Sequence, residues 1–188
     1  MSRLQQLRTV IGWRTVFTCC LAFAVVVAMW QGWIHYADRL PQPDQTVRLG
    51  STVTSDGATY RLDRLDIRTE FPAQEPDQPV VRAPDGAVII LALITTEIID
   101  DGVDPETHFC EATLVGPDGR NWPTESDISL MMKRPDASSC TGSSEKKIKR
   151  HQPLQVGFSF VVPEDVADEV TLWLDVDSGE GEIVEFTR

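Results

Sequence analysis

Four carboxylates crowd into one short stretch of the chain, at Asp100, Asp101, Asp104 and Glu106. Hard oxygen ligands at this density can hold Ca²⁺ in a loop. The same residues also fit a solvated acidic turn between two strands, which needs no ligand. The stretch therefore predicts either a calcium-binding loop or a plain polar connection, and calcium is the one cofactor that the sequence brings into consideration.

One basic run stands out on an otherwise acidic chain, at Lys146, Lys147, Lys149 and Arg150, with His151 directly after it. Such a cluster can contact an acidic partner, a lipid headgroup or an anionic wall polymer. It also fits a charged flank that keeps the following strand from pairing with other chains. The run is thus a candidate partner contact, with a soluble strand edge as the alternative.

Two cysteines, Cys110 and Cys140, lie in the C-terminal part of the chain, far from Cys19 and Cys20. If this part lies in an oxidising compartment, the two are expected to form a disulfide. The bridge would close a loop of about 31 residues, which the chain-entropy estimate values at roughly 3–4 kcal/mol. A zinc or redox pair is less consistent, because no Cys-x-x-Cys spacing is present.

No pattern of catalytic residues accompanies these clusters. His35, His108 and His151 are far apart in the sequence, and neither His-Glu-x-x-His nor Gly-x-Ser-x-Gly occurs. We therefore expect each histidine to be an ordinary surface residue. The prediction that follows is a protein that is not an enzyme.

An uncharged run at residues 15–34, TVFTCCLAFAVVVAMWQGWI, precedes all of these clusters. A helix of about 20 residues is roughly 30 Å long, which matches the hydrocarbon core of a bilayer. Arg3, Arg8 and Arg14 come before the run and no acidic residue does, so the N-terminus is expected in the cytoplasm. A signal peptide cleaved after Ala28 is the alternative. The aromatic residues that end the run, at Trp30, Trp33 and Tyr36, favour an uncleaved anchor instead.

The predicted organisation has four parts. Residues 1–14 form a cytoplasmic basic tail, residues 15–36 a single transmembrane helix, residues 37–46 a linker, and residues 47–188 an extracytoplasmic domain. All 29 acidic residues but only 14 of the 17 basic ones lie in residues 35–188, a net charge of −15. Since phosphates would be repelled, nucleic acid is not an expected partner.

Alternating apolar and polar residues predict seven or eight short strands in the extracytoplasmic part. They cover residues 47–54, 60–67, 87–99, 109–115, 154–162, 170–176 and 182–187, with a return strand starting near residue 120. Ser55-Asp56-Gly57 predicts a hairpin turn, and a phase shift between Leu62 and Leu65 predicts a bulge. The run at 87–99 favours a strand buried on both faces. The expected fold is all-β, an antiparallel immunoglobulin-like β-sandwich, with a barrel as the alternative.

Two segments, FCEATLVGPDGRNW at 109–122 and VGFSFVVPEDVADEVTLWLDV at 156–176, carry a resemblance. Together with the basic tail and the apolar run, residues 47–187 are similar to actinobacterial single-pass membrane proteins with an immunoglobulin-like ectodomain of unknown function. The resemblance implies the fold and the location, and that family brings no active site with it.

The function expected from the sequence is a membrane-anchored, extracytoplasmic binding or accessory module that recognises a protein partner at the cell envelope. A subunit of a transport or secretion complex fits this description. The proline-rich segment 71–86 and the polar segment 123–152 are expected to be exposed contact loops. The alternative is a calcium- or ligand-sensing ectodomain that uses the acidic loop at 100–106.

Overall fold

The structure is a computed structural model of the chain, and it describes residues 17–31, 42–73, 75, 77–125, 128, 137–143, 146–177 and 181–188. The chain divides into two compact units, Met1–Gln42 and Pro43–Arg188. Each unit is described by itself below.

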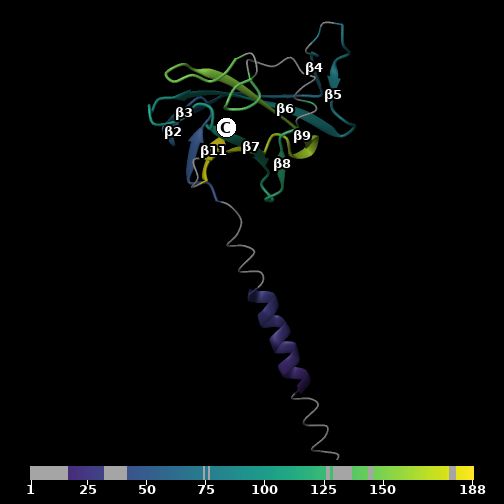
Figure 1. Cartoon of the computed structure of the whole chain (residues 1–188). Coiled ribbons are helices and arrows are strands. Elements are labelled where there is room, and N and C mark those ends of the chain that lie inside the picture. The colour runs from purple at the N-terminus through teal and green to yellow at the C-terminus, as the bar shows by residue number, and fades with distance from the viewer. Residues whose placement is uncertain are drawn as a thin grey trace, which may run out of the picture. The chain divides into compact units, whose positions relative to one another are not determined.

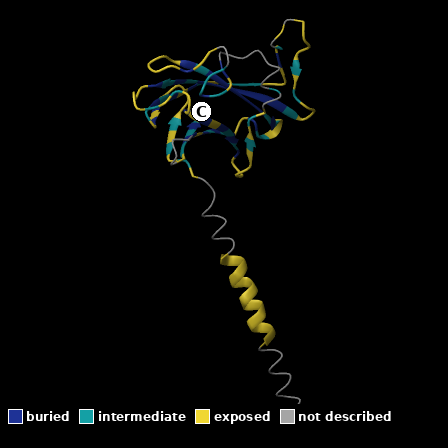
Figure 2. Cartoon of the chain, in the orientation of Figure 1, coloured by how far each residue is buried: buried dark blue, intermediate teal, exposed yellow. Residues whose placement is uncertain are grey.

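The first unit contains a helix at residues 17–31, and every residue of that helix is exposed (Figure 2). Large apolar side chains lie along it, including Phe23, Met29 and Trp30 at 67–72% exposed. Among the described residues, no helix combines the length and the hydropathy that crossing a membrane requires. The tail at 1–14, both ends of the predicted span at 15–36 and the first half of the linker at 37–46 lie outside the described residues.

The second unit is a β-sandwich, as the sequence predicted (Figure 1). One sheet has the strand order β1 (Gln45–Arg48), β11 (Glu182–Thr187), β10 (Thr171–Asp177), β7 (Phe109–Val115) and β8 (Asn121–Pro123). The other has the order β2 (Thr52–Ser55), β3 (Ala58–Arg68), β6 (Ala87–Ile98) and β9 (Leu154–Pro163). A short 3-10 helix, η1 (Glu164–Val166), follows β9.

The strands are mostly antiparallel, with one exception that the sequence did not predict. β1 pairs with β11 in parallel, and β2 pairs with β3 in the other sheet. The single strand predicted at 47–54 is therefore two strands, because Gly50 takes a φ of +80° and turns the chain from one sheet to the other. β1 begins at Gln45, so the sandwich includes residues assigned to the linker from the sequence.

The hairpin predicted at Ser55-Asp56-Gly57 is confirmed. Asp56 and Gly57 both have positive φ, 48° and 69°, as a two-residue type I′ turn requires. The predicted bulge is also confirmed, since the register between β3 and β6 shifts between Leu62 and Arg64. These two features fix which side chains of β3 face the core.

The main core lies between the two sheets and is built from alternating side chains. β6 and β9 contribute Ile90, Ile94 and Phe160, while β10 and β11 contribute Leu174 and Phe186, all of them at most 1% exposed. Burial of this much apolar surface is the main source of stability for a sandwich of this kind.

A second apolar cluster covers the opposite face of β6. Ile89 and Leu91 point away from the main core and pack with Phe71 and Val81. Phe71 and Val81 pair in a small separate sheet formed by β4 (Glu70–Phe71) and β5 (Val81–Arg82). The burial of β6 on both faces is thus confirmed. The segment 71–86 is not simply an exposed loop, because its two ends form a cover for β6.

The outer edge of β9 is also covered. Glu125 donates its backbone N–H to Ser159 O at 2.8 Å, and Gly157 donates to Ala137 O at 2.9 Å. An uncovered edge strand of this length would invite pairing with other chains. The described ends of the segment 123–152 therefore have a structural role beside β9.

One buried hydroxyl yields a stability prediction. Thr96 Oγ1 is buried without a hydrogen-bond partner, whereas Thr95 Oγ1 donates to Asp63 Oδ2 at 2.6 Å. We expect Thr96→Val to raise the free energy of unfolding by about 1 kcal/mol, because it removes an unsatisfied polar group and keeps the shape. The neighbouring Thr95→Val should lower it by about 1 kcal/mol. Urea unfolding of both variants decides this, and a loss of stability in Thr96→Val would show that its hydroxyl is satisfied.

Candidate functional site

The candidate site lies where two connections meet at one end of the sandwich. The first is the β6–β7 connection at residues 99–108, and the second is the part of the β8–β9 connection at residues 139–143 and 146–153. The predicted disulfide joins Cys140, in the second connection, to Cys110 in β7, two residues after the first connection. Both cysteines are buried, at 2% and 0% exposed. The bridge therefore ties the second connection to the core beside β7.

The predicted acidic loop and the predicted basic run contact each other. Lys147 Nζ lies 3.4 Å from Glu106 Oε1, and His151 Nε2 lies 3.1 Å from Asp101 Oδ1. Arg150 donates from Nε and Nη2 to Val103 O at 3.0 and 2.8 Å. The two clusters that the sequence offered as separate sites are thus one site, in which opposite charges partly neutralise each other.

The remaining carboxylates of the acidic loop hold its own turns. Asp100 Oδ1 accepts the N–H of Gly102 at 2.8 Å, and Asp104 Oδ1 accepts the N–H of Glu106 at 3.0 Å. Ile99 and Asp100 also donate their backbone N–H groups to Gly57 O. Among the residues that the structure describes, no three His, Cys, Asp or Glu side chains are placed to hold a metal ion. Calcium sensing by this loop is the alternative hypothesis, and the experiment below tests it.

We expect millimolar calcium to leave the melting temperature of the protein unchanged. The four candidate carboxylates are directed to four different partners and do not converge on one point, so calcium binding would require the loop to rearrange. If calcium bound with a Kd one hundredth of its concentration, binding would add about 2.7 kcal/mol to the free energy of unfolding. A thermal melt with calcium, compared with one in magnesium, makes the test. A calcium-specific rise of several degrees would contradict this expectation and favour the ion-sensing alternative.

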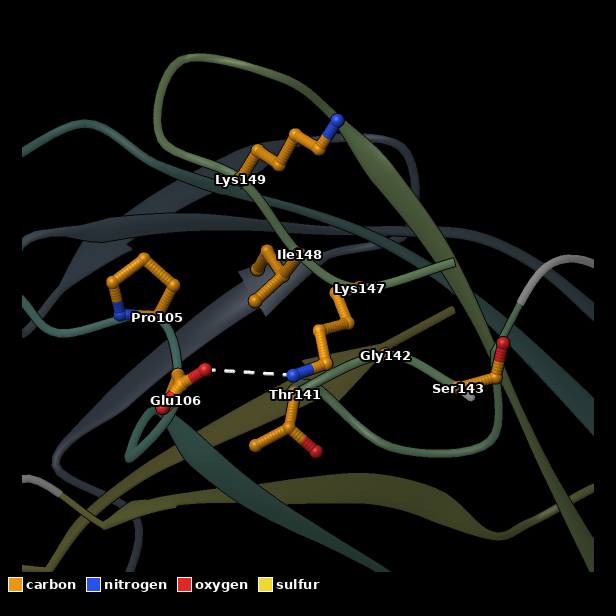
Figure 3. A pocket seen from close by; sticks show the side chains of 8 residues that line it. All are labelled: Pro105, Glu106, Thr141, Gly142, Ser143, Lys147, Ile148 and Lys149. Atoms are coloured by element: carbon orange, nitrogen blue, oxygen red, sulfur yellow. Dashed lines mark hydrogen bonds and ion pairs between the residues drawn. The ribbon is translucent and has the colours of Figure 1, made fainter. Parts of the chain in front are cut away.

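A pocket of about 700 Å³ opens between the two connections (Figure 3). It is lined by Pro105, Glu106, Thr141, Gly142, Ser143, Lys147, Ile148 and Lys149. Lys147 reaches toward Glu106 across the pocket, whereas Lys149 extends away from that pair. Ile148 is 4% exposed and belongs to the main core, so the pocket wall is anchored. The lining is mixed, with ammonium, hydroxyl and carboxylate groups beside apolar surface.

The shape of one pocket wall depends on Gly142. Its φ is +96°, and a Cβ added there would lie 2.3 Å from Lys146 O and 2.7 Å from Lys147 Cα. Only glycine fits this conformation and this close backbone approach. The turn that follows brings Lys146 N within 3.0 Å of Ser143 Oγ, and Ser143 N within 2.8 Å of Lys146 O. The lysines are thus held on a defined backbone.

A buried tyrosine–histidine pair lies at the start of β7, close in sequence to the site. His108 is 3% exposed and Tyr60 is 0% exposed, and Tyr60 Oη lies 2.8 Å from His108 Nε2. The expectation that His108 is an ordinary surface residue is therefore wrong. Burial lowers the pKa of the His108 imidazole, and the Asp56 carboxylate offsets part of this effect. Burial also raises the pKa of the Tyr60 hydroxyl, with Asp56 and Glu182 adding to the rise.

The lowered pKa of His108 predicts that the protein loses stability in mild acid. Below the usual histidine pKa of about 6.5, the unfolded chain takes up a proton that the folded chain resists, so the free energy of unfolding falls. Above that pH the imidazole is neutral in both states, and this contribution is constant. Urea midpoints between pH 5.5 and 7.5 should therefore vary less in His108→Gln than in the unchanged protein. The exposed His151→Gln is the control, and an undiminished pH dependence in His108→Gln would contradict the account.

Sequence reasoning missed two features of the site. One is the buried Tyr60–His108 pair, although His108, Cys110, Ala112 and Leu114 alternate and therefore share one inward face. The other is the pocket itself, where residues 105–106 meet residues 141–143 and 147–149. The predicted disulfide was the one signal in the sequence that these segments lie close to each other.

Comparisons with known proteins give information about the fold only. No protein-family model and no curated protein matches the chain. A conserved hypothetical protein from Bacillus anthracis is similar in structure, with a TM-score of 0.52 and 14% identity over 72% of this chain and 93% of that one. The chain is a β-sandwich. An uncharacterized beta-sandwich protein from Clostridium difficile 630 aligns with a TM-score of 0.48 and 12% identity, over 78% of this chain and 95% of that one.

Proposed function

We propose that the protein is a membrane-anchored, extracytoplasmic binding or accessory module that recognises a protein partner at the cell envelope, such as a subunit of a transport or secretion complex. It acts without catalysis, and its immunoglobulin-like ectodomain presents the pocket lined by residues 105–106, 141–143 and 147–149 as the contact surface. The N-terminus is cytoplasmic and a single helix spans the membrane. This matches the resemblance to single-pass actinobacterial proteins drawn from the sequence.

The observation that carries the proposal is the pocket held between two anchored connections. The Cys110–Cys140 disulfide, the Arg150 hydrogen bonds to Val103 O and the burial of Ile148 fix its walls. Loops fixed on a rigid sandwich are a common way to present a recognition surface. A pre-organised surface loses little conformational entropy when it binds a partner.

The anchor rests on the sequence and on the exposure of the N-terminal helix. Residues 15–34 carry no charge, and the described helix at 17–31 exposes apolar side chains on all sides. An apolar surface of this extent favours an apolar environment, such as a bilayer or a partner. The disulfide supports an oxidising compartment for the sandwich.

Cysteine labelling in intact cells tests the orientation. The variants Ser2→Cys and Asp168→Cys are made in a Cys19→Ser/Cys20→Ser background, so that only the new thiol reacts with a membrane-impermeant maleimide. The Asp168 side chain is 93% exposed, which makes it accessible to the reagent. We expect Asp168→Cys to be labelled in intact cells and Ser2→Cys only after lysis. The reverse pattern, or equal labelling of both, would rule out the proposed location.

Cross-linking in the native membrane, followed by purification of the full chain, tests the partner. We expect one dominant envelope protein to co-purify, and the double variant Lys147→Glu/Lys149→Glu to lose it. The control, Arg64→Glu/Arg82→Glu, changes the charge equally at exposed positions on β3 and β5. If both double variants keep the partner, the pocket is not the contact surface. If nothing co-purifies with the unchanged protein, the proposed function fails.

A further inference from the structure

The ion pair across the pocket contributes little to the fold. Lys147 Nζ and Glu106 Oε1 are 3.4 Å apart, and their side chains are 70% and 78% exposed. Ion pairs this exposed are weak and are screened by salt. The second connection is already fixed by its disulfide to Cys110 in β7 and by the contact of Arg150 with Val103. The pair can therefore open without disturbing the pocket walls.

The groups around this pair suit an incoming oxyanion. Lys149 makes no ion pair within the described part of the chain, and it lies on the same backbone segment as Lys147. The Ser143 hydroxyl accepts the N–H of Lys146, so this bond leaves its own proton available to a ligand. Thr141 Oγ1 shares a hydrogen bond of 2.9 Å with Ser139 Oγ, and because Ser139 Oγ donates to Gly142 O, the Thr141 proton is used within this turn. Ammonium and hydroxyl donors on one lining are the chemistry that binds a carboxylate.

We propose that the pocket binds a carboxylate side chain of an acidic peptide segment, and that this carboxylate replaces Glu106 as the partner of Lys147. The inference rests on the proposed function, because it names the chemistry of the partner at the same pocket. In the free protein Lys147 already pairs with a carboxylate, that of Glu106, and the ligand carboxylate would take the same place. Lys149 and the Ser143 hydroxyl line the same pocket, where they are available to other groups of the peptide.

A peptide side chain fits this site better than a charged surface does. The part of the chain from residue 35 onward has a net charge of −15, so an extended anionic membrane surface is repelled. Asp100, Asp101 and Asp104 lie on the connection that forms one wall of the pocket, and they add to this repulsion. A single carboxylate that enters a concave site meets Lys147 at short range, where the attraction between opposite charges is strongest.

The test measures binding of a hexaglutamate peptide with blocked termini to the full chain in an uncharged detergent. Hexaglutamine, blocked in the same way, is the control peptide. We expect hexaglutamate to bind and hexaglutamine not to bind. Glu106→Gln should bind hexaglutamate about two- to fivefold more tightly, because an exposed competing ion pair is lost. Lys147→Gln should bind it at least about fivefold more weakly, whereas Arg64→Gln on β3 should bind it unchanged.

Three results would overturn the inference: Glu106→Gln with unchanged affinity, Lys147→Gln with unchanged affinity, or equal binding of the two peptides. Binding to vesicles rich in phosphatidylglycerol that depends on Lys147, without peptide binding, would overturn it in favour of a lipid ligand. The experiments distinguish a failure of this inference from a failure of the proposed function. Cross-linking that captures a partner from both unchanged protein and Glu106→Gln in equal amounts rejects the carboxylate exchange alone. Peptide binding as expected, with no partner in cells, rejects the protein partner alone.

Discussion

Replacing Cys110 and Cys140 together by alanine is expected to lower the free energy of unfolding by about 3.5 kcal/mol. The bridge joins residues 30 apart in the sequence, and closing a loop of this size removes conformational freedom mainly from the unfolded chain. Among the described residues of the second connection, Ile148 is the main apolar anchor besides Cys140, so the position of this connection depends on the bridge. Urea unfolding of the full chain, followed by circular dichroism, measures the loss.

The matched control for the disulfide replaces Cys19 and Cys20, which are free and exposed on the N-terminal helix. We expect that pair of substitutions to leave the urea midpoint of the sandwich unchanged. The cysteine-to-alanine pair at the site should also weaken hexaglutamate binding, since one pocket wall follows Cys140 directly. A loss below about 1 kcal/mol would show that the connection is held by other contacts.

Phe71→Ala is expected to lower the free energy of unfolding by about 3 kcal/mol. Phe71 is 5% exposed and packs with Ile89 and Leu91 on the outer face of β6. Truncating a buried phenylalanine removes its apolar contacts and leaves a cavity, which typically costs 3–5 kcal/mol. We take the low end because this cluster is small and lies under a two-stranded cover. Urea unfolding gives the value.

Val80→Ala is the control within the same segment, because Val80 is 45% exposed. We expect it to change the free energy of unfolding by less than about 0.5 kcal/mol. If Phe71→Ala behaved like Val80→Ala, the segment 71–86 would be an exposed loop after all. The outer face of β6 would then require a different cover.

The parts of the fold that follow local rules could be predicted from the sequence. Asp56-Gly57 gives the hairpin because both residues tolerate positive φ, and the run at 87–98 gives a strand buried on both faces because apolar side chains occupy both of its parities. The phase shift after Leu62 gives the bulge for the same local reason. Each of these signals lies within a few residues of the feature that it predicts.

Features that depend on contacts between distant segments could not be predicted. The run at 47–54 alternates like a single strand, and only the pairing of β1 with β11, about 140 residues later, shows that it belongs to two sheets. Phe71 looked like part of a proline-rich loop, because its burial depends on the outer face of β6. Sequence patterning shows which face is apolar, but not which distant segment covers it.

The residues of the candidate site could be recognised from the sequence, but the contacts between them could not. Cys110–Cys140, Asp100 to Glu106 and the run from Lys146 to Arg150 were all visible as residue types. Their meeting was not, because opposite charges far apart in sequence carry no sign of their pairing. Consequently the acidic loop suggested calcium and the basic run suggested a partner. In the structure, the two clusters contact each other, through Lys147 with Glu106 and through His151 with Asp101.

Site-specific photo-cross-linking in intact cells tests the central claim most directly. A photoreactive residue is placed at position 149 beside the pocket, or at the exposed position 168 near η1 as a control, in the full chain. The account predicts one dominant cross-linked envelope protein from position 149 and none from position 168. The absence of any adduct from position 149, or the same adducts from both positions, would contradict a protein-binding role for the pocket.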